Sequence, residues 1–274
     1  MKKSPLVSIN IPTLNSERTI KICLDGVKNQ SYKNIELILI DSFSTDKTVE
    51  IAKQYGAKIY LQKGLIKQRM LGVEKSKGDF ILLLDSDQVM DKDLIKKCVE
   101  KINAGYNTLI LPEKSVHDNS LISRLIAYNM FVVQADKDVN YGTALPRFIK
   151  SSYLKKIGSV PEELGYFDHA FIYNEILKIG AKVDYVNTII YHHELNSWLK
   201  VIRKFYKQYG LSFIPSLKYS KKLIVGRSLP RRAFFSKTAF NNPLLWLGLI
   251  FLYGLKATAS CIGVLDYVLF NKFR

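Results

Sequence analysis

Short apolar runs alternate with amphipathic segments along the first part of the chain. The predicted strands are residues 6–11, 35–40, 57–61, 80–84 and 108–111. In the intervening segments apolar residues recur at the three- and four-residue spacing of a helix; the predicted helices are residues 20–27, 48–55, 65–76 and 94–102. A parallel strand covered by helices on both faces is apolar nearly throughout, as residues 35–40 are. The pattern therefore predicts an α/β fold with a Rossmann-like, mostly parallel sheet flanked by helices.

Polar residues follow three of the predicted strands at the point where each strand ends. The three segments are PTLNSE at residues 12–17, DSFSTD at residues 41–46 and DSD at residues 85–87. In an open α/β sheet, ligands bind outside the carboxyl ends of the strands. We therefore expect the three segments to line one crevice.

Asp85 and Asp87 directly follow the fourth predicted strand. Residues two apart on an extended segment face the same way, so both carboxylates can point to one site while Ser86 points elsewhere. Two carboxylates with room for water and phosphate suit Mg²⁺ or Mn²⁺ better than Zn²⁺. Asp-x-Asp is also an ordinary turn sequence, and Asp41 and Ser44 can equally be turn and helix-capping residues. The sequence predicts a metal site and leaves the turn as the alternative.

The charge distribution divides the chain near residue 195. The net charge is +17 and the pI about 9.6, yet residues 1–195 are close to charge balance and residues 196–265 contain no Asp or Glu. Such an excess of positive charge suits nucleic acid, an anionic membrane surface or phosphorylated substrates. We expect a domain over residues 1–195 and a basic, apolar, helical, membrane-associating region over residues 196–274.

The C-terminal region contains the run LLWLGLIFLYGL at residues 244–255. As a helix it is about 18 Å long, against about 30 Å of membrane hydrocarbon. Extension to residue 270 places Lys256 in mid-span, at a cost of about 2.5 to 3.5 kcal/mol. An interfacial helix or shallow hairpin on anionic headgroups fits better, and a helix packed inside an oligomer is the alternative. The N-terminal MKKSPLVSINIP lacks the apolar run of a signal peptide, so we expect the protein on the cytoplasmic face of the membrane.

Two longer segments bring these motifs together in one order. VSINIPTLNSERTIKICLDGVKNQSYKNIELILIDSFSTDKTVEIA and, further on, KQRMLGVEKSKGDFILLLDSD resemble the opening of the family 2 nucleotide-sugar glycosyltransferases, which have the GT-A fold. The resemblance covers residues 5–112 and, more loosely, residues 145–195. It implies transfer, with inversion, of a sugar from a UDP- or GDP-linked donor to an acceptor, with Mn²⁺ or Mg²⁺ as cofactor.

The resemblance also implies roles for single residues. The donor nucleotide would contact the polar segments after the strands and the Arg-x-x-Gly of residues 69–72; the candidates are Pro12, Thr13, Asn15, Glu17, Asp41, Ser42, Arg69, Asp85 and Ser86. The metal candidates are Asp87, Asp85 and His192, with Glu194 as a further possibility. Relatives usually have Asp-Asp-Gly-Ser-Thr-Asp where this chain has Asp-Ser-Phe-Ser-Thr-Asp. The second carboxylate and the glycine are therefore missing, and the base specificity is open.

The catalytic base is expected in GYFDHAFIYNEILKIGAKV, where the family commonly has Glu-Asp at the start of a helix. Asp168 is the first candidate and His169 the second. A carboxylate there can take the proton of the acceptor hydroxyl, which contributes about 10²- to 10⁴-fold to the rate. An ordinary acidic residue stabilised by the helix dipole is the alternative for Asp168. For His192, at the end of a strand predicted over residues 183–191, the alternative is a polar strand terminus.

Basic residues recur at three- and four-residue spacing just after the predicted boundary. The candidates for binding the acceptor or its phosphate are Arg203, Lys204 and Lys207. With the apolar C-terminal region they predict a lipid-linked acceptor hydroxyl or phosphate. Two other functions stay open: a basic nucleic-acid-binding protein, although no such motif is present, and a sugar-phosphate nucleotidyltransferase, although that class has a Gly-rich, Arg-containing loop where this chain has PTLNSE. We expect no nucleic-acid partner.

Overall fold

The computed structural model describes residues 4–135, 146–193, 197–221, 224–225 and 232–270. The chain forms two compact units. The first comprises Met1–Lys114, Ala144–Val160 and Ile172–His193, and the second comprises Ser115–Thr143, Pro161–Phe171 and Glu194–Arg274. Among the described residues, 115–135 and 161–171 belong to the second unit together with the C-terminal part of the chain. The domain boundary near residue 195 stays a prediction.

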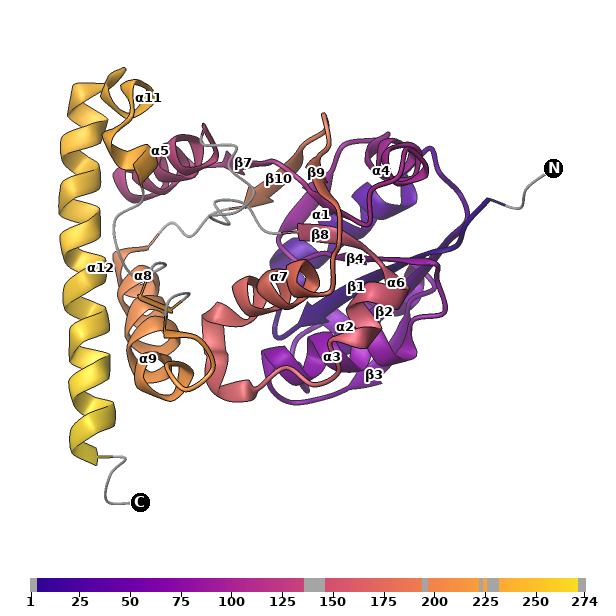
Figure 1. The fold of residues 1–274 in the computed structure, drawn as a ribbon, viewed down its shortest axis with the longest axis horizontal. Helices are drawn as coiled ribbons and strands as arrows, with labels where there is room; N and C mark the ends of the chain where they lie inside the picture. The colour runs from indigo at the N-terminus through magenta and orange to yellow at the C-terminus, as the bar shows by residue number, and fades with distance from the viewer. Residues whose placement is uncertain (1–3, 136–145, 194–196, 222–223, 226–231, 271–274) are drawn as a thin grey trace. The chain divides into compact units, whose positions relative to one another are not determined.

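A seven-stranded sheet forms the centre of the first unit (Figure 1), in the order β3-β2-β1-β4-β8-β6-β9. Its strands are β1 (Val7–Thr13), β2 (Ile35–Asp41), β3 (Lys58–Leu61), β4 (Phe80–Leu83), β6 (Thr108–Ile110), β8 (Pro146–Lys150) and β9 (Val183–Tyr185). The pairs β3–β2, β2–β1, β1–β4 and β6–β9 are parallel, whereas β8 is antiparallel to both of its neighbours. The predicted α/β class with a mostly parallel sheet is confirmed. The antiparallel β8 was not predicted.

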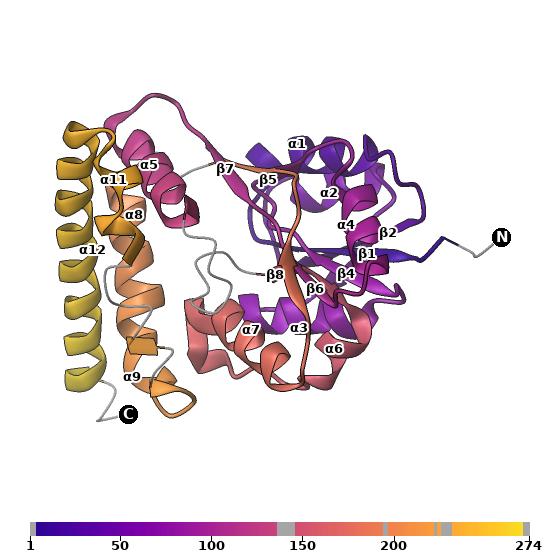
Figure 2. The same ribbon diagram turned by 45° about the horizontal axis from the view of Figure 1, so that its top comes forward.

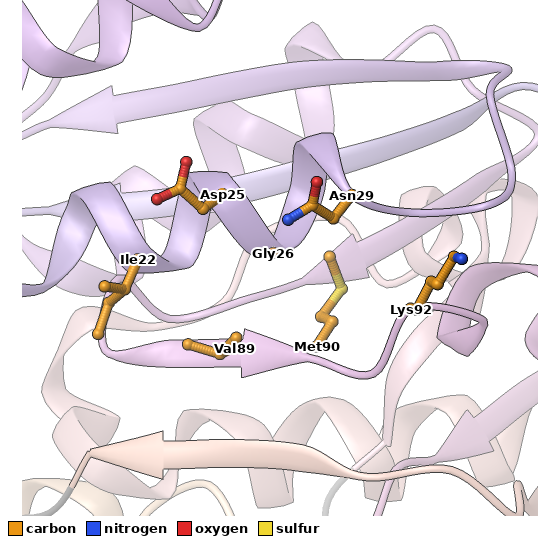
Figure 3. Close-up of a pocket in the computed structure, with 7 residues that line it drawn as sticks. All are labelled: Ile22, Asp25, Gly26, Asn29, Val89, Met90 and Lys92. Carbon is orange, nitrogen blue, oxygen red and sulfur yellow. The ribbon is translucent and has the colours of Figure 1, made fainter.

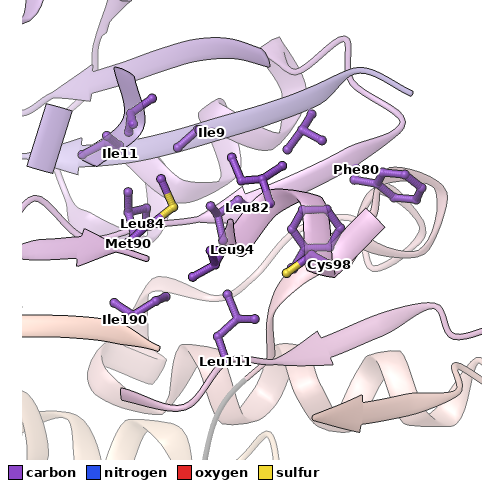
Figure 4. Packing of buried hydrophobic residues seen from close by; sticks show 14 of the residues in the cluster. Ile9, Ile11, Phe80, Leu82, Leu84, Met90, Leu94, Cys98, Leu111 and Ile190 are labelled. Atoms are coloured by element: carbon purple, nitrogen blue, oxygen red, sulfur yellow. The ribbon is translucent and has the colours of Figure 1, made fainter. Parts of the chain in front are cut away.

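Helices connect the parallel strands and cover the sheet. The helices are α1 (Glu17–Lys28), α2 (Thr48–Gln54), α3 (Leu65–Lys75), α4 (Leu94–Asn103), α6 (Ser151–Lys156) and α7 (Asp168–Lys178), the last of which begins in the second unit. The apolar faces of α1 and α4 pack with β1 and β4 in one cluster (Figure 4), in which Ile9, Leu82 and Leu94 are fully buried. Burial of this kind contributes about 25 cal/mol for each Å² of apolar surface, and it fixes the strand ends that carry the polar segments.

Helix α3 lies unusually close to the sheet because residue 72 is glycine. A Cβ atom at Gly72 would lie 2.8 Å from Ile40 Cδ1 and 3.0 Å from Asn10 Nδ2. One turn earlier, Gln68 Nε2 donates hydrogen bonds to Thr13 O and Ile40 O, at 2.9 and 2.6 Å. These contacts hold the first turns of α3 at the carboxyl ends of β1 and β2 and so place Arg69 there.

A second, three-stranded sheet has the order β5-β10-β7 and comprises β5 (Gln88–Met90), β10 (Ile190–His193) and β7 (Glu113–Val116). The single strand predicted over residues 183–191 is wrong, because β9 and β10 belong to different sheets. The connecting residues 186–189 are held by Asp91, which follows β5 and whose Oδ2 accepts hydrogen bonds from Thr188 Oγ1 and Ile189 N. This connection sends His192 towards the end of β4.

The second unit is helical. It contains α5 (Leu121–Ala135), α8 (Trp198–Lys204), the π-helical η3 (Phe205–Gly210), α9 (Leu211–Ser216), α11 (Lys237–Phe240) and α12 (Pro243–Phe270), with the 3₁₀ segments η2 (Glu162–Phe167) and η4 (Arg232–Phe235). Figure 2 shows α12 alongside α5, α8 and α9. Leu249 and Leu252 of α12 are fully buried in an apolar cluster with residues of α5 and α8. A Cβ atom at Gly210 would lie 2.7 Å from Gly263 Cα, so η3 and α12 approach closely there.

Helix α12 is continuous over 28 residues, or about 42 Å. The shallow hairpin considered for the C-terminal region is therefore wrong. By length and composition alone, α12 is the one helix among the described residues that is long and apolar enough to cross a membrane. The predicted basic helix face ends at Lys204, where the α-helical spacing gives way to the π-helical segment.

The close approach of α3 makes a prediction about Gly72. Gly72→Ala should destabilise the first unit by about 1 to 3 kcal/mol, because Ile40 and Asn10 must move to admit the methyl group. Gly254→Ala on α12 is the matched control, since nothing lies within 4 Å of its Cβ position and alanine favours a helix. Urea unfolding measures both. An unchanged midpoint for Gly72→Ala would show that α3 does not depend on this contact.

Candidate active site

The carboxylate of Asp41 is the centre of the first group of polar contacts. Asp41 is the last residue of β2, lies beside Thr13 in the strand register and is 1 % exposed. Its Oδ1 accepts hydrogen bonds from Thr13 Oγ1 (2.8 Å) and Ser44 Oγ (2.6 Å), and its Oδ2 accepts one from Ser44 N (2.7 Å). Ser44 therefore closes the loop after β2 and does not cap α2; at that helix, Asp46 Oδ1 accepts from Thr48 N (3.0 Å).

The loop after β1 is tied to the loop after β2. Asn15 N donates to Ser44 Oγ (2.8 Å), and Asn15 Oδ1 accepts from Thr45 N (2.9 Å). Glu17 N donates to Asp46 Oδ2 (3.0 Å), which fixes the start of α1. Pro12 lies buried within β1, and Ser42 N donates to Thr13 O (2.8 Å). The predicted donor-binding residues of these two loops thus form one connected edge.

The loop after β4 joins the same edge. Ser16 Oγ and Ser86 Oγ lie 2.9 Å apart in a hydrogen bond. The expected convergence of the three polar segments is confirmed in the structure. The extended conformation predicted for residues 85–87 is wrong, however, because the chain turns at Ser86 and Asp87 and Gln88 N donates to Asp85 O (3.1 Å).

The turn directs the carboxylates of Asp85 and Asp87 to different cations. Asp85 Oδ1 lies 3.1 Å from Arg69 Nη2, and its Oδ2 lies 3.1 Å from Arg147 Nη1. Asp87 Oδ2 lies 3.3 Å from His192 Nε2. Residues 85–87 therefore form a turn, which was the alternative left open by the sequence. Both carboxylates of this turn nevertheless contact cationic side chains.

Glu113 connects the two carboxylates into one network. Its Oε1 lies 2.7 Å from Arg147 Nε, and its Oε2 lies 3.2 Å from His192 Nδ1. Arg147 also donates from Nη1 to Leu83 O (3.3 Å) at the end of β4, and its side chain is only 8 % exposed. The order of contacts is Arg69, Asp85, Arg147, Glu113, His192 and Asp87. We refer to these six residues as the charge network.

The charge network holds His192 protonated and Glu113 ionised. Burial alone lowers the pKa of His192, but the contacts and charges of Asp87 and Glu113 raise it, to about 11. Burial raises the pKa of Glu113, but the charge of Arg147 and the contacts with His192 lower it, to about 2. The stabilisation from His192 is complete below its unfolded pKa and is lost as the pH rises through about 11. That from Glu113 is complete above its unfolded pKa and is lost as the pH falls through about 2.

The donor set at Asp87 fits a divalent metal ion. Asp87 Oδ1 is buried and has no hydrogen-bond partner in the structure, so one carboxylate oxygen is left for a further ligand. Both oxygens of Asp85 contact arginine, which leaves Asp87 as the better candidate of the two. Within the part of the chain that the structure describes, no group of three or more His, Cys, Asp or Glu side chains is arranged to hold a metal ion. A metal here would therefore take its other ligands from water and a bound phosphate.

Glu113 and Arg147 were not among the residues singled out from the sequence. Glu113 follows a predicted strand, as the other polar segments do, so its position carried a usable signal. Arg147 stands alone among apolar neighbours in ALPRFI, and a single charge in a buried run points to a paired side chain. The position of Arg147 beside the end of β4 was not predicted, because β8 itself was not predicted.

The remaining candidates belong to the second unit. Asp168 is the first residue of α7 and is 1 % exposed; its Oδ1 accepts from His169 N (2.7 Å), and His169 is also buried. Arg203 and Lys207 are exposed, on α8 and η3 respectively, and Lys204 is half-buried at the end of α8. Glu194 lies outside the described residues.

A hollow of about 520 Å³ lies between α1 and β5 (Figure 3). It is lined by Ile22, Asp25, Gly26, Asn29, Val89, Met90 and Lys92. None of these side chains belongs to the polar segments or to the charge network. We therefore assign the site from the residues at the strand ends and not from this hollow.

Comparison with known proteins places this geometry in a family. The model of the family described as "Glycosyl transferase family 2" matches residues 8–152, more than half of the chain. An uncharacterised glycosyltransferase of Haemophilus influenzae is 29 % identical over 211 residues, which are 72 % of this chain and 80 % of that protein. Other curated relatives are matched over a smaller part of their length, between 15 % and 63 %.

Solved structures share the fold at low sequence identity. The mannosyltransferase PcManGT from Pyrobaculum calidifontis, in complex with GDP-Man and Mn²⁺, has a TM-score of 0.67 at 14 % identity, over 98 % of this chain and 88 % of that one. TarS 1–349 from S. aureus, in complex with UDP-GlcNAc, has a TM-score of 0.57 at 17 % identity, over 96 % and 91 %. The fold is therefore of the GT-A type.

The charge network predicts how His192 responds to the loss of one neighbour. Glu113→Gln should lower the pKa of His192, because one of its two carboxylate neighbours loses its charge. NMR titration of the His192 ring protons measures this. The wild-type signal should not titrate around neutral pH, and a midpoint near the ordinary histidine value of about 6.5 would contradict the network.

The same substitution should also reduce stability, by about 3 to 5 kcal/mol, since the buried Arg147 loses a partner. Glu175→Gln is the matched control. Glu175 pairs with Lys178 on the exposed side of α7 (2.6 Å), where a pair contributes less than about 1 kcal/mol.

Proposed function

Since this chain belongs to glycosyltransferase family 2, we propose that it transfers a sugar, with inversion, from a UDP- or GDP-linked donor to a lipid-linked acceptor hydroxyl or phosphate. The observation that carries the donor side is the connected edge formed by the loops after β1, β2 and β4. Family membership favours this function over sugar-phosphate nucleotidyl transfer and over nucleic-acid binding.

The nucleoside of the donor is assigned to the loops after β1 and β2. Thr13, Asn15 and Asp41 lie there with Pro12, Glu17 and Ser42, on backbone that the hydrogen bonds around Ser44 hold in place. The diphosphate is assigned to the neighbouring end of β4, close to Arg69, Asp85 and Ser86. Bound GDP-Man in PcManGT and UDP-GlcNAc in TarS support a nucleoside diphosphate sugar as the donor.

A divalent metal, Mn²⁺ or Mg²⁺, is proposed at Asp87. Its unpartnered Oδ1 supports this assignment, and His192 and Asp85 are the neighbouring candidates for contact with the ion or the diphosphate. When bound, such an ion stabilises the negative charge that develops on the leaving diphosphate. The residues of the charge network keep the Asp87 carboxylate oriented, because His192 is itself fixed by Glu113.

Asp168 is proposed as the base that takes the proton of the acceptor, with His169 as the second candidate. Asp168 is the first residue of α7, so its side chain lies at the positive end of the helix dipole. One base and direct displacement of the diphosphate invert the anomeric carbon. Arg203, Lys204 and Lys207 of the second unit are proposed to bind the phosphate of the acceptor.

The outer face of α12 supports a lipid environment for the acceptor. Its exposed large side chains are Leu244, Leu247, Ile250, Phe251, Ile262, Leu265, Leu269 and Phe270. We call this set the apolar stripe. Lys256 instead lies over the rings of Phe205 and Tyr253 (5.0 and 5.2 Å), and Asp266 accepts a hydrogen bond from Tyr206.

No charged residue interrupts the apolar stripe. The exposed Thr258 donates its hydroxyl hydrogen to Gly254 O (3.0 Å) of the same helix, which satisfies the hydroxyl without water. A helix with one apolar face and its charges packed inward suits the surface of a bilayer. We propose attachment to the cytoplasmic face of the membrane through this stripe.

The donor site predicts metal-dependent nucleotide binding. Calorimetric titration with UDP and with GDP, each with and without Mn²⁺, should show tight binding of at least one nucleotide only when Mn²⁺ is present. Asp87→Ala should weaken that binding by at least about 100-fold, because the metal loses its protein ligand.

Asp79→Ala is the matched control, since Asp79 precedes β4 at the opposite end and accepts a hydrogen bond from Leu6 N. The control should bind the nucleotide as the wild type does. Equal binding by wild type and Asp87→Ala in the presence of Mn²⁺ would remove the metal role of Asp87.

The apolar stripe predicts binding to anionic vesicles. Leu247→Glu combined with Phe251→Glu should reduce co-sedimentation with phosphatidylglycerol vesicles by about tenfold or more, because both side chains are exposed on the stripe. Ile179→Glu, at an exposed apolar position of the first unit, is the control and should bind as the wild type does. Substitution is a better test than deletion of the helix, which would also remove Leu249 and Leu252 from the core. Unchanged sedimentation of the double variant would disprove the membrane contact.

A further inference from the structure

Three large apolar side chains are exposed where β1, β2 and β3 end. Leu14 is 58 %, Phe43 51 % and Leu61 56 % exposed, and among the described residues of the first unit these are the most exposed large apolar side chains. The strand register aligns Thr13 with Asp41 and Asp41 with Leu61, so the three exposed side chains belong to neighbouring positions on one edge. The same edge carries the proposed nucleoside site.

Phe43 has a backbone conformation that a bulky residue seldom adopts. Its φ is +59°, in the left-handed region that favours glycine. The loop keeps this conformation because Ser44 is bonded to Asp41 on one side and to Asn15 on the other. The chain therefore keeps a phenylalanine at a position where glycine would be less strained. Strained residues of this kind are concentrated at functional sites.

Packing does not account for the side chain of Phe43. Half of its surface is exposed, and it is absent from the buried cluster that β2 and its neighbours form. Lys63 lies over its ring, with Nζ 5.5 Å from the ring centroid. Lys63 follows β3, so the ammonium group comes from the next strand end along the same edge.

We propose that Phe43 is a donor-binding residue that stacks on the base of the donor nucleotide, with Leu14 and Leu61 extending the apolar surface beside it. The inference rests on the proposed function, because it takes the nucleoside diphosphate as the ligand. An aromatic ring offers a face and no hydrogen-bonding pattern, so stacking accepts pyrimidines and purines alike. A chain that lacks the second acidic residue after β2 thus holds its donor base by stacking.

The test compares three substitutions at one position. Phe43→Gly removes the ring and relieves the backbone strain. Phe43→Leu keeps an apolar side chain without a ring, and Phe43→Tyr keeps an aromatic ring. Calorimetry with UDP and GDP in the presence of Mn²⁺ gives the affinities, and urea unfolding gives the stability. We expect Phe43→Gly to weaken both nucleotides by about tenfold or more, Phe43→Leu to weaken them nearly as much, and Phe43→Tyr to bind within about twofold of the wild type.

Two further readouts separate stacking from a structural role of the loop. Phe43→Gly should raise the urea midpoint, because glycine relieves the strained backbone, while it weakens nucleotide binding. If Phe43 stabilised the loop, the same substitution would lower the midpoint. Binding of Mn²⁺ with inorganic pyrophosphate, which has no base, should be the same in the wild type and in Phe43→Gly. An equal loss of pyrophosphate affinity would show that Phe43 acts through the loop and would overturn the inference.

The inference and the proposed function can fail separately. If the wild type binds a nucleotide and Phe43→Gly binds it equally well, the donor site stands and the stacking role is wrong. If the wild type binds neither UDP nor GDP under any condition, the proposed donor chemistry is wrong and the stacking role falls with it.

Discussion

The guanidinium group of Arg147 is the constraint on which the site depends. It is nearly buried, and it contacts the carboxylates of Asp85 and Glu113 and the carbonyl of Leu83. A buried cation is stable only when such partners are fixed around it. The turn after β4, the start of β7 and the position of β8 in the sheet are therefore coupled at one side chain. The antiparallel β8 is part of the sheet and also positions Arg147 at the strand ends, beside the site.

The charge network is balanced without a ligand. With His192 protonated, it contains three cations and three carboxylates, joined by contacts of 2.7 to 3.3 Å. A nucleoside diphosphate alone would add negative charge to this arrangement, whereas a diphosphate accompanied by a divalent cation would nearly preserve the balance. Charge balance is thus consistent with the proposal that a nucleoside diphosphate donor binds together with a divalent metal ion. Within the charge network, Asp87 Oδ1 is the carboxylate oxygen that is buried without a hydrogen-bond partner, which agrees with the proposed position of the added cation.

The sequence allowed the fold class, the strands that carry the site and the convergence of their polar ends to be predicted. Each of these follows from local periodicity and from the rule that parallel strands end at one edge. Pairing between distant strands has no such local signal, so the antiparallel β8 and the separation of β9 from β10 were missed. The turn at Ser86 was considered only as an alternative, because Asp-Ser-Asp suits a turn and an extended metal-binding segment equally well. Arg147 and Glu113 acquire their roles only when these pairings bring them together, 34 residues apart in the chain.

The place of β8 in the sheet has a consequence for synthesis of the protein. Strand β4 pairs with β1 on one side and with β8 on the other, and all four of its residues are buried. Until β8 (Pro146–Lys150) has been synthesised, β1 to β4 can assemble, but the edge of β4 that pairs with β8 stays open. An apolar strand with a free edge is prone to pair with other chains. Protection of that edge during translation, by the ribosome or a chaperone, therefore matters more for this protein than for one whose sheet is completed in the order of its sequence.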